Sequence, residues 1–298
     1  MSLSEDAPQL SFCRILVATD FEPASEMATA YAATLARYFG SRLAVANVID
    51  LSLATASEVT GVGPTREQMW QSSLDKMGRV IDQMNQLGIN VDSRELDSPH
   101  PAAAIVELAN ASNPNLLVLG TSARRGPDKL IRGSCAEDVI HHARCPVITL
   151  GPKARPSRES ELSLKTIVFA TDTQHQVVER AGLALALAKA VRAKVYICYV
   201  VDGSGTGKLR LSEIQSQAEL ALRKAVPASL YSWCNIEYVV RTGSPGERIL
   251  DLAKEVKADL IAMGARHRSP CDTAHLTQGI VEHVVAEAEC PVMTLSTD

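Results

Sequence analysis

The segment RILVATDFEP, Arg14 to Pro23, returns later in the chain as TIVFATDTQH, Thr166 to His175. Both copies share the pattern Ile-x-x-Ala-Thr-Asp, which ends at Asp20 and again at Asp172, 152 residues further on. In each copy a short apolar run leads into Thr-Asp, as expected of a buried strand. A repeat at this distance predicts duplicated domains, because solenoid repeats have periods of only about 20 to 50 residues.

The later parts of the two copies also match. AIVELANASNPNLLVLG parallels RILDLAKEVKADLIAMG, and ARCPVITL parallels AECPVMTL near the end of each copy. A polar, proline-containing stretch at 153–163 separates the copies and is typical of a linker. The sequence therefore predicts two domains, 1–152 and 164–298, joined by this linker.

Strand-like and helix-like segments alternate within each copy. In the first copy, apolar or alternating runs predict strands at 14–19, 42–49, 90–96, 115–120 and 146–150. Helical patterns predict helices at 25–39, 66–87, 101–111 and 134–143. Such alternation predicts an α/β fold, with two tandem open, parallel five-stranded sheets that carry helices on both faces.

Composition excludes several classes of protein. With 46% hydrophobic but only 4% aromatic residues, the core must consist mainly of Ala, Val, Leu and Ile. The net charge of −4 and the lack of a long basic block give no support for nucleic-acid binding. No apolar run approaches 18 residues, and the seven cysteines form no Cys-x-x-Cys pair. Together with an N-terminus that lacks a signal-peptide pattern, this predicts a cytoplasmic protein with no membrane partner.

The segment DGSGTGKL, Asp202 to Leu209, looks at first like a P-loop. It lies between a strand-like and a helix-like run, which is the context of that motif. The spacing is wrong, however, because Asp202 takes the place of the first glycine and Leu209 that of the hydroxyl residue. The matching loop of the first copy, 51–64, shows no such pattern. We interpret both loops as connectors.

Two other loops of the first copy carry groups that suit a nucleotide. Asp20, beside Thr19, can accept hydrogen bonds from a ribose hydroxyl or an adenine amino group, or can form an Asx turn. The second loop, GTSARRGPDKLIRGSCAE from Gly120 to Glu137, leads from a buried strand into a helix. Its pattern Ser134-x-x-Glu137 predicts a capping box at a helix start whose free N–H groups favour an anion. A solvated basic loop before an ordinary capped helix is the alternative interpretation.

The whole chain resembles a tandem universal stress protein. The resemblance rests on the strand that ends in Thr-Asp, the strand that ends in glycine, the Gly-Ser before a helix, and the terminal Cys-Pro-Val-x-Thr-Leu. In nucleotide-binding members the loop reads Gly, two residues, Gly, nine residues, Gly, Ser/Thr. Gly120, Gly133 and Ser134 fit this pattern, whereas Ala123 stands where the second glycine belongs. The extra methyl group puts a tight approach of phosphates at Ala123 in doubt.

The resemblance implies a fold like that of the adenine-nucleotide alpha-hydrolases and an adenine nucleotide bound by the first copy. ATP is the expected ligand, with AMP or ADP as alternatives and Mg²⁺ as an accompanying ion. Thr19 and Asp20 would face the adenosine, and Val48 would offer its backbone to adenine. The residues expected around the ribose and phosphates are Gly120, Ser122, Ala123, Gly133, Ser134 and Cys135.

The second copy departs further from the family pattern. His267 takes the position of the second glycine, and Gln278-Gly279 aligns with the Gly-Ser of the first copy. Pro270 interrupts the loop, although Asp172 remains. We therefore expect the second copy to bind ATP weakly or not at all.

Metal binding and catalysis are poorly supported by the sequence. Adjacent His141 and His142 do not share a helix face, and His267, Cys271 and His275 make up only three ligands. No serine-hydrolase, metalloprotease or paired-carboxylate motif is found, so no catalytic residue is assigned. An enzymatic role is left undecided, with slow ATP hydrolysis and nucleotidyl transfer as its two forms.

Short apolar strands close both copies, at Pro146–Leu150 and Pro291–Leu295. Such an edge invites pairing with another strand, or it can simply close its own sheet. The family resemblance implies antiparallel pairing of two domains here, which predicts an internal pseudo-dimer. A further homodimer of the whole chain is left open.

The expected function is that of an ATP-binding or adenine-nucleotide-binding regulatory protein in stress response, with the nucleotide held mainly by the first copy. A slow ATPase is one alternative. A protein-interaction scaffold that binds no nucleotide is the other, and the alanine at position 123 is the feature that favours it.

Overall fold

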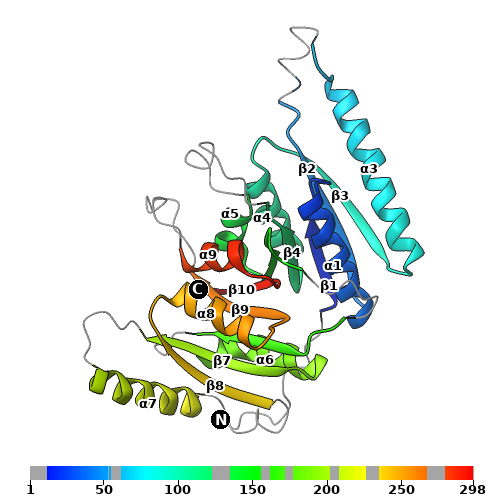
Figure 1. The fold of residues 1–298 in the computed structure, drawn as a ribbon. Helices are drawn as coiled ribbons and strands as arrows, with labels where there is room; N and C mark the ends of the chain where they lie inside the picture. Colours follow the sequence, from blue (N-terminus) through cyan, green and yellow to red (C-terminus); the bar gives the residue numbers. More distant parts are fainter. Residues whose placement is uncertain are drawn as a thin grey trace.

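The structure is a computed structural model of the 298-residue chain. It describes residues 12–52, 54, 62–122, 135–155, 162–171, 177–201, 208–225, 235–266 and 279–297. Within these ranges, strands and helices alternate in both halves of the chain (Figure 1).

The first half supplies five strands and four long helices among its described residues. In chain order they are β1 (Arg14–Ala18), α1 (Pro23–Phe39), β2 (Arg42–Ile49), α3 (Arg66–Gln86), β3 (Val91–Asp97), α4 (Pro101–Ser112), β4 (Leu116–Gly120), α5 (Cys135–His142) and β5 (Val147–Leu150). The second half repeats this order with β6 (Thr166–Ala170), α6 (Val177–Val191), β7 (Lys194–Val201), α7 (Lys208–Ala225), β8 (Asn235–Thr242), α8 (Pro245–Glu255), β9 (Leu260–Arg266), α9 (Ile280–Glu287) and β10 (Val292–Thr297).

Local sequence signals explain where the helices of the first half begin and end. α1 has Pro23 in its first turn and ends at Gly40, whose φ of 65° suits a residue without Cβ. α3 begins with a capping box in which the Thr65 hydroxyl and the Gln68 side chain bond each other's backbone N–H. α4 ends at Asn113 in the left-handed conformation, with φ 45°.

All strands join one ten-stranded sheet in the order β3-β2-β1-β4-β5-β10-β9-β6-β7-β8. Pairing is parallel within each half, as predicted, and antiparallel where β5 meets β10, with Val292 opposite Thr149. The predicted pairing of the two closing strands is thus present within the chain. Figure 1 shows α3 beside β2 and β3 at one end of the molecule and α7 beside β8 at the other.

Both faces of the sheet are buried, each under its own layer of helices. Ile15 and Val17 of β1 belong to the core on the side of α1 and α3, and the alternate residues Leu16 and Ala18 belong to the core on the side of α4 and α5. Each core continues into the second half, where Ile167 of β6 extends the first. Near-continuous apolar strands are expected when a parallel sheet is covered on both faces.

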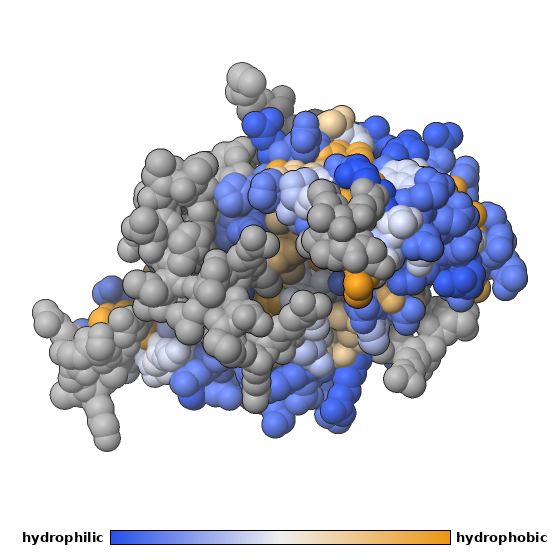
Figure 2. Space-filling model, turned by 90° about the horizontal axis from the view of Figure 1, so that it is seen from above, coloured by the Kyte–Doolittle hydropathy of each residue, from blue (hydrophilic) through white to orange (hydrophobic). Residues whose placement is uncertain are grey.

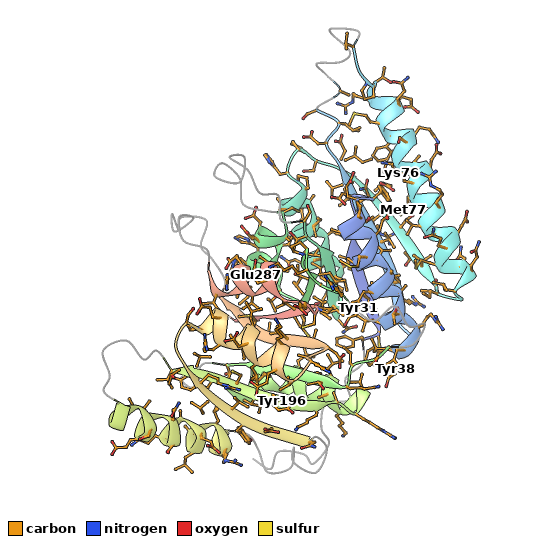
Figure 3. The ribbon with its side chains drawn as sticks, viewed as in Figure 1. Tyr31, Tyr38, Lys76, Met77, Tyr196 and Glu287 are labelled. Carbon is orange, nitrogen blue, oxygen red and sulfur yellow. The ribbon has the colours of Figure 1, made fainter. Side chains whose placement is uncertain are left out.

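The two halves also touch through their helices. On one face, the Tyr38 hydroxyl at the end of α1 donates to the Ala190 carbonyl of α6 at 3.1 Å (Figure 3). On the other face, His141 Nε2 of α5 lies 2.7 Å from Glu282 Oε1 of α9, and both side chains are buried. The halves therefore form one continuous structure rather than two separate domains on a tether.

Candidate functional site

The candidate site lies where β1 and β4 end side by side. The chain leaves β1 toward β2 on one side, whereas β4 flanks β1 on the other, so the connections diverge between β1 and β4. Ligands of open α/β sheets bind beyond the carboxyl ends of strands at such a point. Thr19 and Asp20 follow β1, and Gly120 is the last residue of β4.

The view in Figure 2 looks onto the side of the molecule that is uppermost in Figure 1, where β2 and β4 end. It shows a hollow with a moderately hydrophobic floor and with hydrophilic side chains along part of its rim. This is the face on which a bound ligand would contact the residues described next.

Thr19 and Asp20 form a tight, fully hydrogen-bonded turn into α1. Thr19 Oγ1 accepts from the Phe21 N–H at 3.0 Å, and Asp20 Oδ1 accepts from the Glu22 N–H at 3.0 Å. The second bond is an Asx turn, the alternative that the sequence left open for Asp20. Phe21 itself has φ 61°, a left-handed conformation that is rare for a bulky residue. The turn is thus a strained conformation stabilised by side-chain contacts.

Ser25, a buried residue in the first turn of α1, organises this turn. Its Oγ accepts from the Thr19 hydroxyl at 3.1 Å and from the Asp20 N–H at 3.2 Å, and it donates to Asp20 Oδ1 at 2.5 Å. These contacts hold Asp20 Oδ1. Asp20 Oδ2 has no hydrogen-bond partner among the described residues, and the residue is exposed. One carboxylate oxygen is therefore available to a ligand while the other keeps the side chain in place.

Asn47 of β2 holds the same turn from the opposite side. Its Nδ2 donates to the Thr19 carbonyl at 2.7 Å, and its Oδ1 lies 2.8 Å from the Ser73 hydroxyl of α3. Ser73 Oγ is also 3.0 Å from Glu95 Oε2 on β3. A chain of polar side chains thus runs from the turn to the edge strand of the sheet.

Gly120 lies directly under the first turn of α1. A Cβ at this position would be 2.1 Å from the Ala24 carbonyl oxygen and 2.7 Å from the Ser25 backbone nitrogen. No side chain fits there, so the glycine allows β4 to end against the start of α1. The packing of α1 is thus a sufficient reason for glycine at position 120, whatever its contacts with a ligand.

The other described residues of the predicted site lie around this edge. Val48 is near the end of β2, half-buried on the side of α4, and Ser122 is exposed just after β4. Cys135 begins α5 and is exposed as a residue. Partial burial of its sulfur away from water raises the pKa of its thiol to about 11, and the nearby carboxylates of Asp138 and Asp20 add to this rise. A thiol with this pKa is protonated at neutral pH and is a poor nucleophile.

The structure brings together part of the predicted site only. Thr19, Asp20, Val48, Gly120 and Ser122 lie at one edge of the sheet. The predicted positions Ala123, Gly133 and Ser134 lie outside the described residues. So do Asp172, the segment 202–207 and the cluster of His267, Cys271 and His275.

The second half keeps Thr171 and the backbone geometry of the site, but not the counterparts of Asn47 and Glu95. The Thr171 N–H donates to the Cys198 carbonyl at 3.0 Å, as the Thr19 N–H does to the Ala46 carbonyl at 2.9 Å. By strand register, Tyr199 takes the place of Asn47, and Val240 opposite it takes the place of Glu95. The start of α9 is capped by Gly279 without a side-chain hydrogen bond.

Several candidates from the sequence have other roles or none. His141 points to Glu282, whereas His142 Nδ1 lies 2.7 Å from the Asp138 carbonyl of its own helix, so the two histidines do not converge. Among the described residues, no group of three or more His, Cys, Asp and Glu could hold a metal ion. No helix in the same ranges is long and apolar enough to cross a bilayer.

Two cavities of the described region lie away from this edge. One of about 70 Å³ lies between the halves beside Tyr31 and Cys290, and one of about 220 Å³ lies at the opposite ends of β1 and β2, beside Arg14 and Arg42. Neither is lined by Thr19, Asp20 or Gly120.

The sequence analysis missed three residues that shape the site: Ser25, Asn47 and Ser73. Asn47 had a signal, since it is the only amide in the strand RLAVANVI. A buried polar residue in such a run requires a partner. Ser25 and Ser73 carried no distinguishing pattern, because serine is common in the first turn and on the faces of helices.

Comparison with known proteins gives the family. The model of the universal stress protein family matches residues 11–150 and again 163–296. A universal stress protein of Methanocaldococcus jannaschii is 27% identical over 150 residues, covering 49% of this chain and 84% of that protein. A putative universal stress protein of Staphylococcus epidermidis is 29% identical over 149 residues, covering 49% and 89%.

Solved structures agree on the fold. A universal stress protein from Archaeoglobus fulgidus superposes with a TM-score of 0.69 at 18% identity, covering 95% of this chain and 96% of its own. That likeness extends over both halves. Because the family model matches each half separately and most of the chain in total, the chain belongs to the universal stress protein family and contains two of its domains in tandem.

Proposed function

We propose that the first half of this chain binds an adenine nucleotide, most favourably ATP, and that the protein acts in regulation rather than catalysis. The observation that carries the proposal is the Thr19–Asp20 turn at the switch point. Ser25 holds one oxygen of Asp20, and the other is exposed without a partner among the described residues. A ribose hydroxyl or the adenine amino group supplies the donor that this oxygen lacks.

The family resemblance supports the same ligand. The glycine and serine positions of the second loop match the nucleotide-binding pattern except at Ala123. We propose that Gly133 and Ser134 bind the phosphates through the backbone at the start of α5, with or without Mg²⁺. The second half has apolar residues at two positions where the first half has a polar chain, and we propose that it binds ATP weakly or not at all.

A regulatory role is proposed because the described residues provide no catalytic pair. The pKa of the Cys135 thiol is raised, and the Asp20 carboxylate is occupied on one side by its own turn. A bound nucleotide would therefore act by stabilising one conformation of the surrounding loops.

The test uses a fluorescent ATP analogue, one variant in the corresponding loop of each half, and a third variant at Asp20. Gly133→Glu places a carboxylate at the proposed phosphate site and should abolish detectable binding, whereas His267→Glu in the second half should leave the affinity unchanged. Asp20→Asn keeps Oδ1 but replaces Oδ2 by an NH₂ group, and should weaken binding by roughly tenfold or more, the loss expected for a hydrogen bond to a charged group.

Other results would favour the alternatives. No binding by the unmodified chain would favour a protein-interaction scaffold. Release of phosphate that is lost in Gly133→Glu would favour a slow ATPase.

A further inference from the structure

The row of hydrogen-bonded side chains behind the candidate site has few hydrogen-bond donors for its acceptors. It starts at the Thr19 carbonyl, passes through Asn47 and Ser73, and ends at Glu95. The Thr19 carbonyl can only accept, so the amide group 2.7 Å away must be the Nδ2 of Asn47. Asn47 Oδ1 therefore faces Ser73, and this oxygen can only accept a hydrogen bond.

Ser73 has one hydroxyl proton and two acceptors within reach. Its Oγ lies 2.8 Å from Asn47 Oδ1 and 3.0 Å from Glu95 Oε2. If Ser73 donates to Asn47, the contact with Glu95 is a hydrogen bond only when Glu95 carries a proton and donates it. If Glu95 is ionised, Ser73 must turn its proton to the carboxylate, and two oxygen lone pairs then face each other at the Asn47 contact. The three contacts are all hydrogen bonds only with Glu95 as the carboxylic acid.

The surroundings of Glu95 favour the acid form. Its Oε1 is buried and has no hydrogen-bond partner within the described ranges, a costly arrangement for an ionised oxygen. Burial raises the pKa of Glu95 above its ordinary value of 4.5, while the Ser73 hydrogen bond partly offsets this rise. The folded chain then binds this proton more tightly than the unfolded chain. The resulting stability is full below about pH 4.5 and is lost as the pH rises through the raised value.

The charged groups on the neighbouring elements have other contacts. On α3, Lys76 lies over the Phe21 ring at 5.6 Å from its centre (Figure 3), and Arg66 lies 3.4 Å from Asp97 at the end of β3. On β3 itself, Arg94 Nη1 donates to the Ser93 carbonyl. β2 presents the neutral Asn47 opposite Glu95, and Asp50 beyond its end accepts from Ser52.

The second half lacks this chain. Tyr199 and Val240 occupy the positions of Asn47 and Glu95, and both pack against the hydrophobic core. The fold therefore accommodates residues other than Asn and Glu at these positions. Buried polar groups usually cost stability unless every partner is satisfied. The row of hydrogen-bonded side chains from Asn47 to Glu95 in the first half thus points to a role beyond folding.

We propose that Glu95, as the carboxylic acid, positions the Thr19–Asp20 turn for nucleotide through Ser73 and Asn47, so that nucleotide affinity falls when Glu95 loses its proton. This regulation rests on the proposed nucleotide binding by the first half. Glu95 is a positioning residue, since nothing brings it into contact with a ligand.

The test compares the pH profile of ATP affinity in the intact chain and in variants. In the unmodified protein the affinity should fall at least about fivefold as the pH rises from about 4.5, where Glu95 is protonated, to about 8, beyond the change seen in Glu95→Gln. Gln is a neutral donor of similar shape, so this variant should match the low-pH affinity of the unmodified protein within about twofold and should show only the pH dependence that both proteins share. Both proteins share the titration of the ATP phosphates, so the difference between their profiles isolates Glu95.

Ser73→Ala should lower the affinity at low pH to the value of the unmodified protein at high pH, and Ser73→Thr should restore it because the hydroxyl returns. Both variants must first show an unchanged far-UV circular dichroism spectrum and a cooperative unfolding transition. An unaltered pH profile in Ser73→Ala would contradict the proposal.

A second measurement does not depend on nucleotide. The side-chain carboxyl carbon of Glu95, assigned in NMR spectra by its loss in Glu95→Gln, should titrate above the ordinary value of 4.5 in the free protein. Titration at or below that value would overturn the inference. So would parallel affinity profiles in the unmodified protein and Glu95→Gln. By contrast, failure of every protein to bind any adenine nucleotide at any pH would refute the proposed function itself, and with it the positioning role.

Discussion

At the scale of single residues, the Ser25 hydroxyl makes most of the side-chain hydrogen bonds that hold the Thr19–Asp20 turn in place. The Ser25 hydroxyl accepts hydrogen bonds from the Thr19 hydroxyl and from the Asp20 N–H, and it donates one to Asp20 Oδ1. The sequence pattern Thr-Asp predicted the position of the carboxylate but not its orientation. Orientation depends on residues from α1 and β2 that meet the turn only after folding, so no local pattern reveals them.

Gly120 gives the sharpest prediction at this scale. Gly120→Ala puts a Cβ about 2 Å from the Ala24 carbonyl, which the structure can relieve only by moving α1 away from β4. We expect a loss of roughly 1–3 kcal/mol or more in the free energy of unfolding, as for other overpacked sites. Chemical denaturation monitored by circular dichroism measures this loss.

Gly78→Ala is the matched control. Gly78 lies inside α3, and a Cβ there meets no atom within 4 Å. This change should stabilise the chain by about 0.5–1 kcal/mol, because alanine is the better helix former. Equal effects of the two substitutions would contradict the close approach of β4 and α1.

At the scale of elements, the strands and helices of the first half follow the predicted ranges closely. The predicted strand 42–49 coincides with β2, and the predicted helix 66–87 ends one residue beyond α3. These elements have strong local signals: apolar runs, a capping box, and a glycine or proline at the ends. What the sequence could not predict is how helices of different halves touch, because such contacts join residues more than a hundred positions apart.

The contact between α5 and α9 is one such case. His141 and Glu282 are each only 6% exposed and are 2.7 Å apart. Glu282→Ala removes this partner of the buried imidazole, and we expect a loss of about 1–3 kcal/mol in the free energy of unfolding. Equilibrium denaturation of the whole chain measures it.

The exposed pair Glu219–Arg223 on α7 serves as the control. Its atoms are 2.8 Å apart, but both side chains are about half exposed. Glu219→Ala should change stability by only about 0.3–0.5 kcal/mol. If Glu282→Ala were as mild as this control, α5 and α9 would not hold the halves together.

At the scale of the whole molecule, the duplication produces a ten-stranded sheet in which each half covers the open edge of the other. The pairing of β5 and β10 was predictable from the family resemblance, whereas the short apolar segment that ends both copies left open whether each strand only closes its own sheet. The asymmetry of the two halves was predictable only in part. The loop differences are visible in the sequence, whereas the polar chain of the first half and its apolar counterpart in the second emerge only from strand register.

Separating the halves tests this arrangement. The fragment 1–152 exposes the edge of β5, which β10 covers in the full chain. Because an exposed apolar edge strand pairs with a second copy, we expect this fragment to dimerise. Light scattering coupled to size-exclusion chromatography measures its mass.

The full chain is the comparison, because β10 already covers β5 there. Pairing of two copies through β5 should therefore occur in the fragment only. A monomeric unmodified fragment would show that β5 does not require a partner strand.

The central claim is that one half of the molecule, and not both, holds an adenine nucleotide. Isothermal titration of the intact chain with ATP measures it most directly, because the stoichiometry counts the sites. We predict one site per chain, lost in Gly133→Glu and retained in His267→Glu. Two equivalent sites, a single site that survives Gly133→Glu, or no heat of binding at any concentration would contradict it.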